Sequence, residues 1–131
     1  MVANRAPHSL KQASLLQLSE QLGYTFRDHA LLKQALTHRS ASLHHNERLE
    51  FLGDSVLNLA MSTWLFHHFP PASEGQLTCL RAGLVQEASL VDLARPLHLG
   101  SLIKFGPGER KTKGGERAST LADTLEAVIG A

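Results

Sequence analysis

The sequence predicts an all-α domain, and three observations lead to this prediction. Apolar residues recur at helical spacing in several segments, and glycine or proline residues separate these segments. No alternation of apolar and polar residues is long enough to indicate a strand. The chain has 131 residues, a length that suits one domain with a core of its own.

Two helices are expected near the start of the chain. Leu10–Leu22 places leucines near helical spacing, and Gly23 can end this helix. Asp28 can cap a second helix that runs to about Thr37, because its carboxylate accepts hydrogen bonds from free backbone N–H groups. Residues 1–9 are expected to form a flexible arm.

The longest periodic segment spans residues 47–69, and the two prolines that follow it end the helix. Its apolar residues cover most faces, so we expect burial, with Trp64, Phe66 and Phe69 in a core or an interface. Ser73 and Gln76 then form the pattern of a capping box, which predicts a helix to about residue 85.

The last third of the chain combines two helices with a glycine-rich segment. Glu87–Ala94 is expected to be a helix, Leu99–Arg117 a loop, and a final helix begins near Ser119. That helix is still periodic at Ala131, so the domain at residues 10–131 is expected to be incomplete at its C-terminus.

Composition excludes several classes of protein. The single cysteine, Cys79, excludes an intramolecular disulfide and fits a reducing compartment. The first nine residues lack the apolar core of a signal peptide, and no apolar run reaches the roughly 18–20 residues of a membrane helix. We therefore expect a cytoplasmic protein with no membrane partner.

Acidic residues on the long helix are the first candidate site. Glu47, Glu50 and Asp54 fall within an arc of roughly 60° on a helix that is otherwise mostly apolar. A buried acidic stripe requires cations, but acids in a first helical turn also interact favourably with the helix dipole. That second explanation covers Glu47 and Glu50 but not Asp54, so a solvated face and a metal site both remain open.

A second acid pair favours the metal site. Asp123 and Glu126 are three residues apart among apolar neighbours on the final helix. Oxygen ligands from two rigid helices suit a hard cation that keeps some of its water. No histidine lies three residues after Glu47, Glu50 or Glu126, which argues against a di-iron site and favours Mg²⁺ or Mn²⁺.

Several motifs resemble one known family. The segment Asn46-Glu47-Arg48-Leu49-Glu50-Phe51-Leu52-Gly53-Asp54-Ser55 is similar to the signature of the ribonuclease III endonuclease domain. Supporting matches occur at residues 36–40, 74–75, 106–109 and 121–127. The resemblance implies a dimeric, all-helical domain that cleaves double-stranded RNA with Mg²⁺, for which Mn²⁺ can substitute. It also implies 5′-phosphate and 3′-hydroxyl products, and substrates among ribosomal RNA precursors and some messenger RNAs.

The resemblance also implies roles for individual residues. The metal ligands would be four carboxylates: Glu50, Asp54, Asp123 and Glu126. Cleavage would depend most on Asp54 and Glu126. Two further acids would support the site, namely Glu47 and Glu74, and Phe51 would pack against the partner subunit. A non-catalytic RNA-binding or scaffold module of the same fold is the alternative.

The charge balance agrees with a nucleic-acid partner once the proposed site is set apart. The formal net charge is +1, and the charge outside the six site acids is +7. Five basic residues of the glycine-rich segment either contact RNA phosphates or are simply solvated: Lys104, Arg110, Lys111, Lys113 and Arg117.

Overall fold

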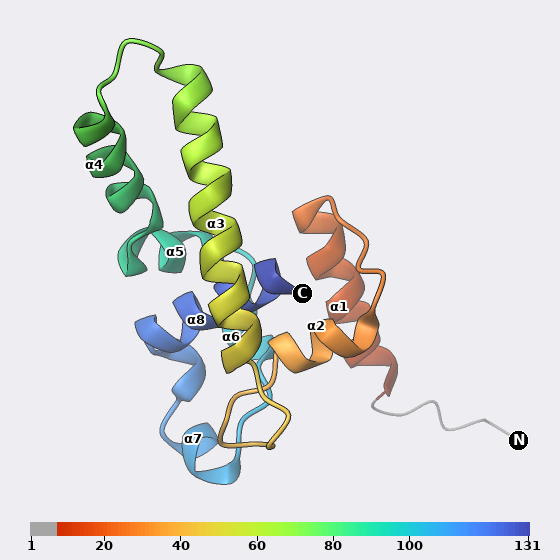
Figure 1. Cartoon of the computed structure of the whole chain (residues 1–131). Coiled ribbons are helices and arrows are strands. Elements are labelled where there is room, and N and C mark those ends of the chain that lie inside the picture. Colours follow the sequence, from red (N-terminus) through yellow and green to blue (C-terminus); the bar gives the residue numbers. More distant parts are fainter. Residues whose placement is uncertain (1–7) are drawn as a thin grey trace, which may run out of the picture.

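A computed structural model describes the backbone of residues 8–131 and the side chains of residues 11–131. Within that span all regular structure is helical, apart from one isolated bridge between Thr37 and Lys104 (Figure 1). The all-α prediction is therefore confirmed. The flexible arm predicted at residues 1–9 lies mostly outside the described residues, and His8 and Ser9 already belong to the first helix.

Six helices correspond to the predicted ones. They are α1 (His8–Leu22), α2 (His29–Ala35), α3 (Glu47–His68), α4 (Glu74–Val85), α5 (Glu87–Ala94) and α8 (Ala118–Gly130).

The prediction of one loop at Leu99–Arg117 is wrong in detail, because this segment contains three short helical turns. These are α6 (Leu99–Leu102), α7 (Pro107–Lys111) and the 3-10 turn η1 (Gly114–Glu116). Each is too short for hydrophobic periodicity to reveal it. Gly100 and Gly115 allow the backbones of α6 and η1 to touch, since a β-carbon on either would overlap or crowd the other's carbonyl group.

Both predicted N-terminal caps are present. The Asp28 carboxylate accepts hydrogen bonds from the backbone N–H groups of Ala30 (2.9 Å) and Leu31 (3.3 Å). At the start of α4, the Gln76 N–H donates to Ser73 Oγ (3.3 Å), while the Ser73 N–H donates to Gln76 Oε1 (2.8 Å). The second helix ends at Ala35 rather than near Thr37, because Thr37 pairs with the strand-like segment at Lys104.

Helix α8 lies at the centre of the fold and packs against α2, α3 and α5 (Figure 1). Its buried residues occupy most of its circumference: Leu121, Ala122, Thr124, Leu125, Ala127 and Val128. The one polar member of this set, Thr124, is fully buried and donates its hydroxyl hydrogen bond to the carbonyl of Thr120 at 2.7 Å. The helix that carries two of the predicted ligands is therefore also the core helix.

Helix α3 differs from the prediction, because this chain alone does not bury it on most faces. Only Leu49, Gly53 and Leu65 are buried. Phe51 is 79% exposed and Phe66 is 66% exposed. The reason is length: α3 extends well beyond α8, and its far half has only α4 beside it (Figure 1).

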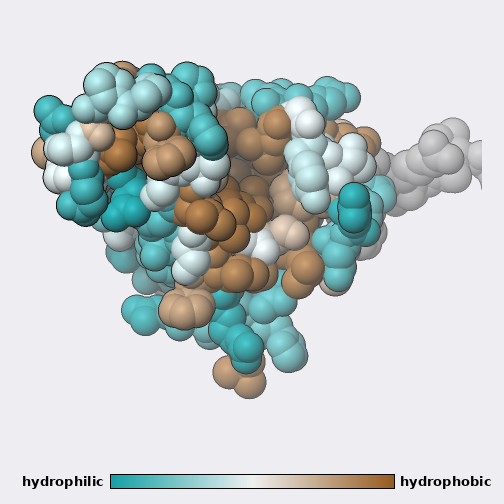
Figure 2. Space-filling model, turned by 45° about the horizontal axis from the view of Figure 1, so that its top comes forward, coloured by the Kyte–Doolittle hydropathy of each residue, from teal (hydrophilic) through white to brown (hydrophobic). Residues whose placement is uncertain are grey.

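Hydrophobic side chains gather in the middle of the face shown in Figure 2. Large exposed apolar residues are numerous on α3, including Leu52, Leu59 and Trp64. A patch of this kind is typical of an association surface. No helix in the described part of the chain is long and apolar enough to cross a membrane.

Candidate metal centre

The candidate site forms where α3 crosses α8 in direct backbone contact. A β-carbon on Gly53 would overlap the carbonyl group of Glu126, and one on Gly130 would overlap the carbonyl group of Leu49. Only glycine permits this approach, because any other residue places an atom between the two backbones. The crossing therefore holds the acid face of α3 against the acid face of α8.

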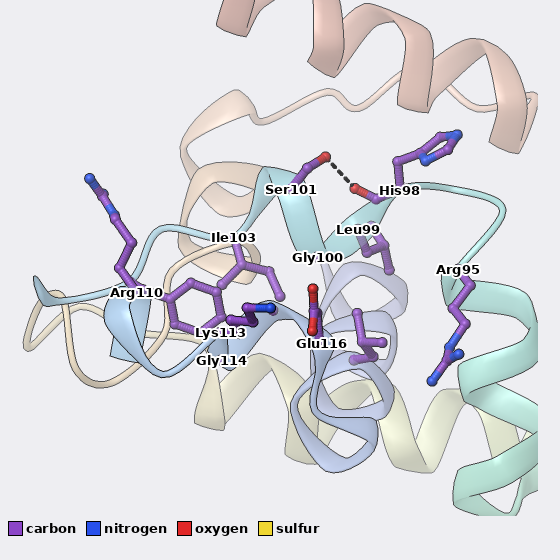
Figure 3. Close-up of a pocket in the computed structure, with 13 residues that line it drawn as sticks. Arg95, His98, Leu99, Gly100, Ser101, Ile103, Arg110, Lys113, Gly114 and Glu116 are labelled. Atoms are coloured by element: carbon purple, nitrogen blue, oxygen red, sulfur yellow. Dashed lines mark hydrogen bonds between the residues drawn. The ribbon is translucent and has the colours of Figure 1, made fainter. Parts of the chain in front are cut away.

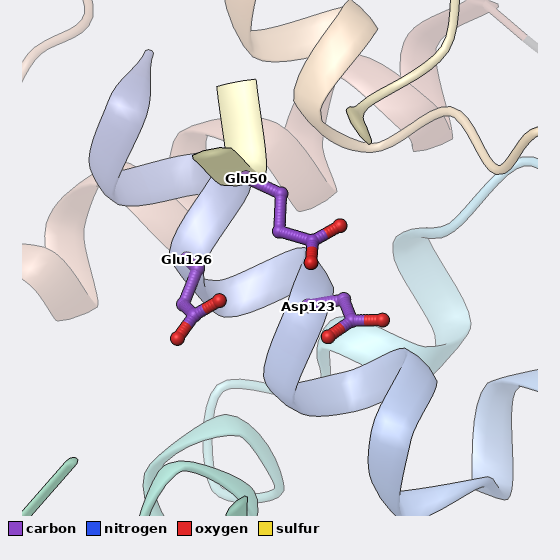
Figure 4. A group of neighbouring side chains, drawn as sticks. All are labelled: Glu50, Asp123 and Glu126. Atoms are coloured by element: carbon purple, nitrogen blue, oxygen red, sulfur yellow. The ribbon is translucent and has the colours of Figure 1, made fainter. Parts of the chain in front are cut away.

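Three carboxylates meet beside this crossing. Glu50 reaches from α3 toward Asp123 and Glu126 on α8 (Figure 4). Each offers one oxygen atom, and these three atoms lie within 4.8 Å of one another. All three residues are partly buried, so their carboxylates keep some contact with water.

Burial and mutual repulsion shift the ionisation of this cluster. Burial, followed by the charges of Asp54, Glu50 and Asp123, raises the pKa of Glu126 to about 7. Burial also raises the pKa of Glu50, and the charges of Asp123 and Glu47 raise it further. Glu126 is therefore partly protonated near neutral pH, and a bound cation would favour its ionised form.

The pKa of Asp123 is also raised, although some of its neighbours lower it. Burial is the largest cause, followed by the charge of Glu87. A hydrogen bond with the Glu50 carboxyl and the charge of His38 act in the opposite direction. His38 lies in the segment between α2 and α3, so this segment also influences the ionisation of Asp123.

The remaining predicted acids lie at different distances from this cluster. Asp54 is exposed one turn after Glu50, near enough for its charge to raise the pKa of Glu126, and its Oδ1 accepts a hydrogen bond from Asn58 (3.2 Å). Glu74 lies in the first turn of α4, where it accepts a hydrogen bond from Thr78 (2.9 Å), and is not among the three clustered acids.

A cavity of about 270 Å³, which we name the acid pocket, opens beside the cluster. Its walls include the acids Glu47, Glu50 and Asp123, and also basic side chains from two other segments. Those basic residues are His38 and Arg39, before α3, and Arg117, immediately before α8. The pocket is therefore lined by both acidic and basic side chains.

The five basic residues predicted to contact RNA do not gather on one wall. Arg117 lines the acid pocket, whereas Arg110 and Lys113 line a separate cavity of about 850 Å³. In Figure 3, Arg110 points away from that cavity and Lys113 lies across it. Lys104 and Lys111 are exposed and line neither cavity.

Among the titratable residues of the acid pocket, sequence reasoning assigned no role to His38, Arg39 and Glu109. The first two belong to the segment at residues 36–40, and Glu109 to that at 106–109, both of which contributed to the family resemblance. The orientation of these two segments depends on the bridge between Thr37 and Lys104, which joins residues 67 positions apart. Helical periodicity carries no information about such a contact.

The residues present suit a hard divalent cation. The clustered donors are all carboxylate oxygens, and they come from two helices fixed against each other. Mg²⁺ prefers oxygen ligands and keeps several waters, so a few carboxylates on a partly open site match its needs. A bound divalent cation would lower the raised pKa of Glu126, because its charge stabilises the ionised carboxylate.

Comparison with known proteins decides the family. A family model described as Ribonuclease-III-like matches residues 28–131. The chain belongs to the ribonuclease III family. It is 54% identical over 118 residues to "Ribonuclease 3" of Pasteurella multocida, covering 90% of the chain and 52% of that protein. Identity to "Ribonuclease 3" of Haemophilus influenzae is 55% over 115 residues, covering 88% of the chain and 51% of that protein.

Solved structures agree with this assignment. The nuclease domain of ribonuclease III from Campylobacter jejuni superposes with a TM-score of 0.84 at 47% identity, covering 87% of this chain and 80% of that one. Dicer from Pichia stipitis gives a TM-score of 0.62 at 36% identity, covering 82% of this chain and 46% of that one. The chain spans about half the length of the curated relatives it matches.

Proposed function

We propose that this chain is an endonuclease domain that hydrolyses phosphodiester bonds of double-stranded RNA with Mg²⁺, for which Mn²⁺ can substitute. One observation carries the proposal: Glu50, Asp123 and Glu126 converge within 4.8 Å across a crossing that only glycine permits. Family membership supports the same activity.

The ligands of the cation would be Glu50, Asp54, Asp123 and Glu126. A bound Mg²⁺ supplies activation of water and neutralisation of charge on the phosphodiester. The charge of Asp54 helps to raise the pKa of Glu126. The resemblance to the family implies that cleavage would depend most on these two residues. Glu47, in the wall of the acid pocket, and Glu74, outside the cluster, would have supporting roles.

A homodimer would cover the exposed face of α3. Phe51 stands 79% exposed, and a largely apolar cavity of about 570 Å³ lies beside it, lined by residues that include Leu31, Leu49 and Leu52. In a two-fold dimer each copy presents the same patch, so Phe51 of one copy can enter the cavity of the other. The similar nuclease domain from Campylobacter jejuni is described as having structural flexibility in a region involved in dimer formation.

The dimer would place one site on each subunit, which suits a duplex whose two strands are both cut. A-form RNA is recognised through its backbone and 2′-hydroxyl groups rather than its base edges. The basic residues Lys104, Arg110, Lys111, Lys113 and Arg117 would contribute to backbone binding. The products would carry 5′-phosphate and 3′-hydroxyl ends, and ribosomal RNA precursors and some messenger RNAs would be the substrates of a cytoplasmic enzyme.

The test is cleavage of a long duplex RNA by the purified chain in a Mg²⁺ titration, with end-group analysis of the products. We expect Glu126→Gln to lower the rate about 100-fold or more, because one charged ligand is lost. Glu20→Gln, on the exposed surface of α1, is the matched control and should cleave like the parent. Equal rates for Glu126→Gln and the parent would contradict the assignment of this ligand. RNA binding without any cleavage by the parent would indicate a non-catalytic module instead.

A further inference from the structure

The acid pocket contains two guanidinium groups that metal binding does not explain. Arg39 comes from the segment between α2 and α3, and Arg117 is the residue immediately before α8. Both line the same cavity of about 270 Å³ as Glu50 and Asp123. A cavity lined by both carboxylates and guanidinium groups suits a ligand that is anionic and also shares a cation.

We propose that Arg39 and Arg117 form a seat for a backbone phosphate of bound RNA, next to the phosphate that is cleaved. This inference rests on the proposed function, since it takes the occupant of the pocket to be an RNA strand. Guanidinium groups bind phosphate through two parallel hydrogen bonds, so two of them can fix one phosphate in both position and orientation.

The two arginines are held differently. Arg117 Nη1 lies 3.1 Å from Glu109 Oε2, and its Nη2 donates a hydrogen bond to Thr112 Oγ1 at 3.2 Å. Arg39 Nη1 lies 3.7 Å from Glu47 Oε1, and its side chain is 73% exposed. Arg117 is therefore positioned before RNA arrives, whereas Arg39 is free to close over the strand.

Glu109 is the positioning residue for Arg117. Its Oε2 is shielded from solvent, and Arg117 is its one charged partner in the described part of the chain. Gly114 packs so closely that a β-carbon there would lie 2.9 Å from this oxygen. The carboxylate is thus confined, and the guanidinium group that pairs with it is confined with it.

Neither ion pair prevents phosphate binding. Arg117 is 51% exposed, and Arg39 is more exposed still, so both pairs are screened by water and contribute little to stability. An approaching phosphate can replace the exposed Glu47 as the partner of Arg39, and it can share Arg117 with Glu109, whose Oε2 is shielded from solvent and stays paired. Ser119 and Thr120, in the first turn of α8, also line the pocket and add hydroxyl groups beside Arg117.

The experiment compares Arg39→Gln and Arg117→Gln with Arg27→Gln, which removes the same charge from an exposed position before α2. Binding to a duplex RNA is measured without divalent cations, where the RNA stays intact, as a function of salt. Each pocket variant should bind about tenfold more weakly. The slope of log affinity against log salt should fall by about 1, because one phosphate contact is lost. Arg27→Gln should match the parent in both respects.

Two further variants separate charge from position. Arg117→Lys keeps the charge, so it should keep the salt slope while binding RNA a few-fold more weakly, because lysine lacks the planar fork. Glu109→Gln should also weaken binding with the slope unchanged, because Arg117 is released but still charged. Tighter binding by Glu109→Gln would show that Glu109 only neutralises Arg117, and would overturn its positioning role.

The outcomes distinguish this inference from the proposed function. If the parent cleaves RNA and both pocket variants behave like Arg27→Gln, the phosphate seat is wrong and the nuclease proposal stands. If the variants lose affinity but the parent does not cleave with Mg²⁺, the seat stands and the catalytic proposal is wrong. A parent that neither binds nor cleaves duplex RNA would overturn both.

Discussion

The two halves of α3 are both rich in apolar residues but have different surroundings. The first half crosses α8 at Gly53, with backbone against backbone, and presents Glu50 to two acids of α8. The second half lies beyond α8, where Leu59 is 69% exposed and Trp64 stacks on His68 at the surface rather than in a core. An apolar helix therefore requires covering, but its sequence does not say whether the cover is its own chain or another copy.

The largest effect should come from placing a methyl group in the crossing. Gly53→Ala puts a β-carbon into the carbonyl group of Glu126, so α3 and α8 must separate. We expect unfolding to become easier by about 3 kcal/mol or more, measured by urea denaturation. Gly83→Ala, in α4, meets nothing within 4 Å and should instead stabilise the chain by about 0.5–1 kcal/mol. Similar results for both variants would refute the importance of the crossing.

The next effect concerns the exposed side of α3. Phe51→Asp should weaken self-association about 100-fold or more, because a charge replaces an aromatic residue at the proposed interface. Sedimentation over a range of concentrations measures this, and the monomer should stay folded since Phe51 is exposed in the single chain. Leu16→Asp, on the exposed surface of α1, is the control. A parent that remains monomeric at all concentrations would rule out the dimer.

A pH effect distinguishes the acid cluster from ordinary surface acids. The pKa of Glu126 is about 7 in the folded chain and near its ordinary 4.5 in the unfolded chain, so the folded state binds the proton more tightly. Without divalent cations, stability should therefore fall as pH rises from about 4.5 to about 7. The loss should be on the order of 1 kcal/mol, because solvent screens a half-buried group. Added Mg²⁺ should restore stability at pH 7, and Glu126→Gln should reduce the pH dependence.

The smallest effect compares two helix caps. Ser73→Ala removes the cap of α4, and Asp28→Ala removes that of α2, each at a cost of about 1 kcal/mol. Because α4 packs beside the far half of α3 and α2 contacts α8, only the second loss should appear fully in global unfolding. Amide hydrogen exchange should show the effect of Ser73→Ala as local opening of α4. Equal global effects would mean that both regions unfold as one unit.

Local signals in the sequence predicted the helices well. Asp28 and Ser73 cap the helices that they were expected to cap, and the prolines at positions 70 and 71 follow the end of α3 at His68. The short turns between residues 99 and 116 were missed because glycine propensity indicates where a chain can bend, not how the bends pack. Gly100 and Gly115 are needed because each lies against the backbone of the other. A tertiary contact of this kind cannot be inferred from local sequence.

The site was predictable to the extent that helical spacing defines it. The acid pair on α8 and Glu50 on α3 were found from their spacing, and the structure brings their carboxylates together. Arg39 and Glu109 were not found, because both lie outside the long helices on segments whose direction depends on distant contacts. The spacing also grouped Glu47 with Glu50, and both line the acid pocket. The ion pair between Glu47 and Arg39 was not predicted.

The crossing of α3 and α8 also sets an order in time during synthesis. A ribosome makes the acids of α3 long before those of α8, and the chain between them includes α4, α5 and three short turns. Until α8 has been made and has docked against Gly53, Glu50 and Asp54 face neither Asp123 nor Glu126. Contacts between residues so distant in sequence form slowly compared with local ones. A nascent chain therefore holds half of the ligands and no site, and it can acquire a complete set of ligands only after its core helix is in place.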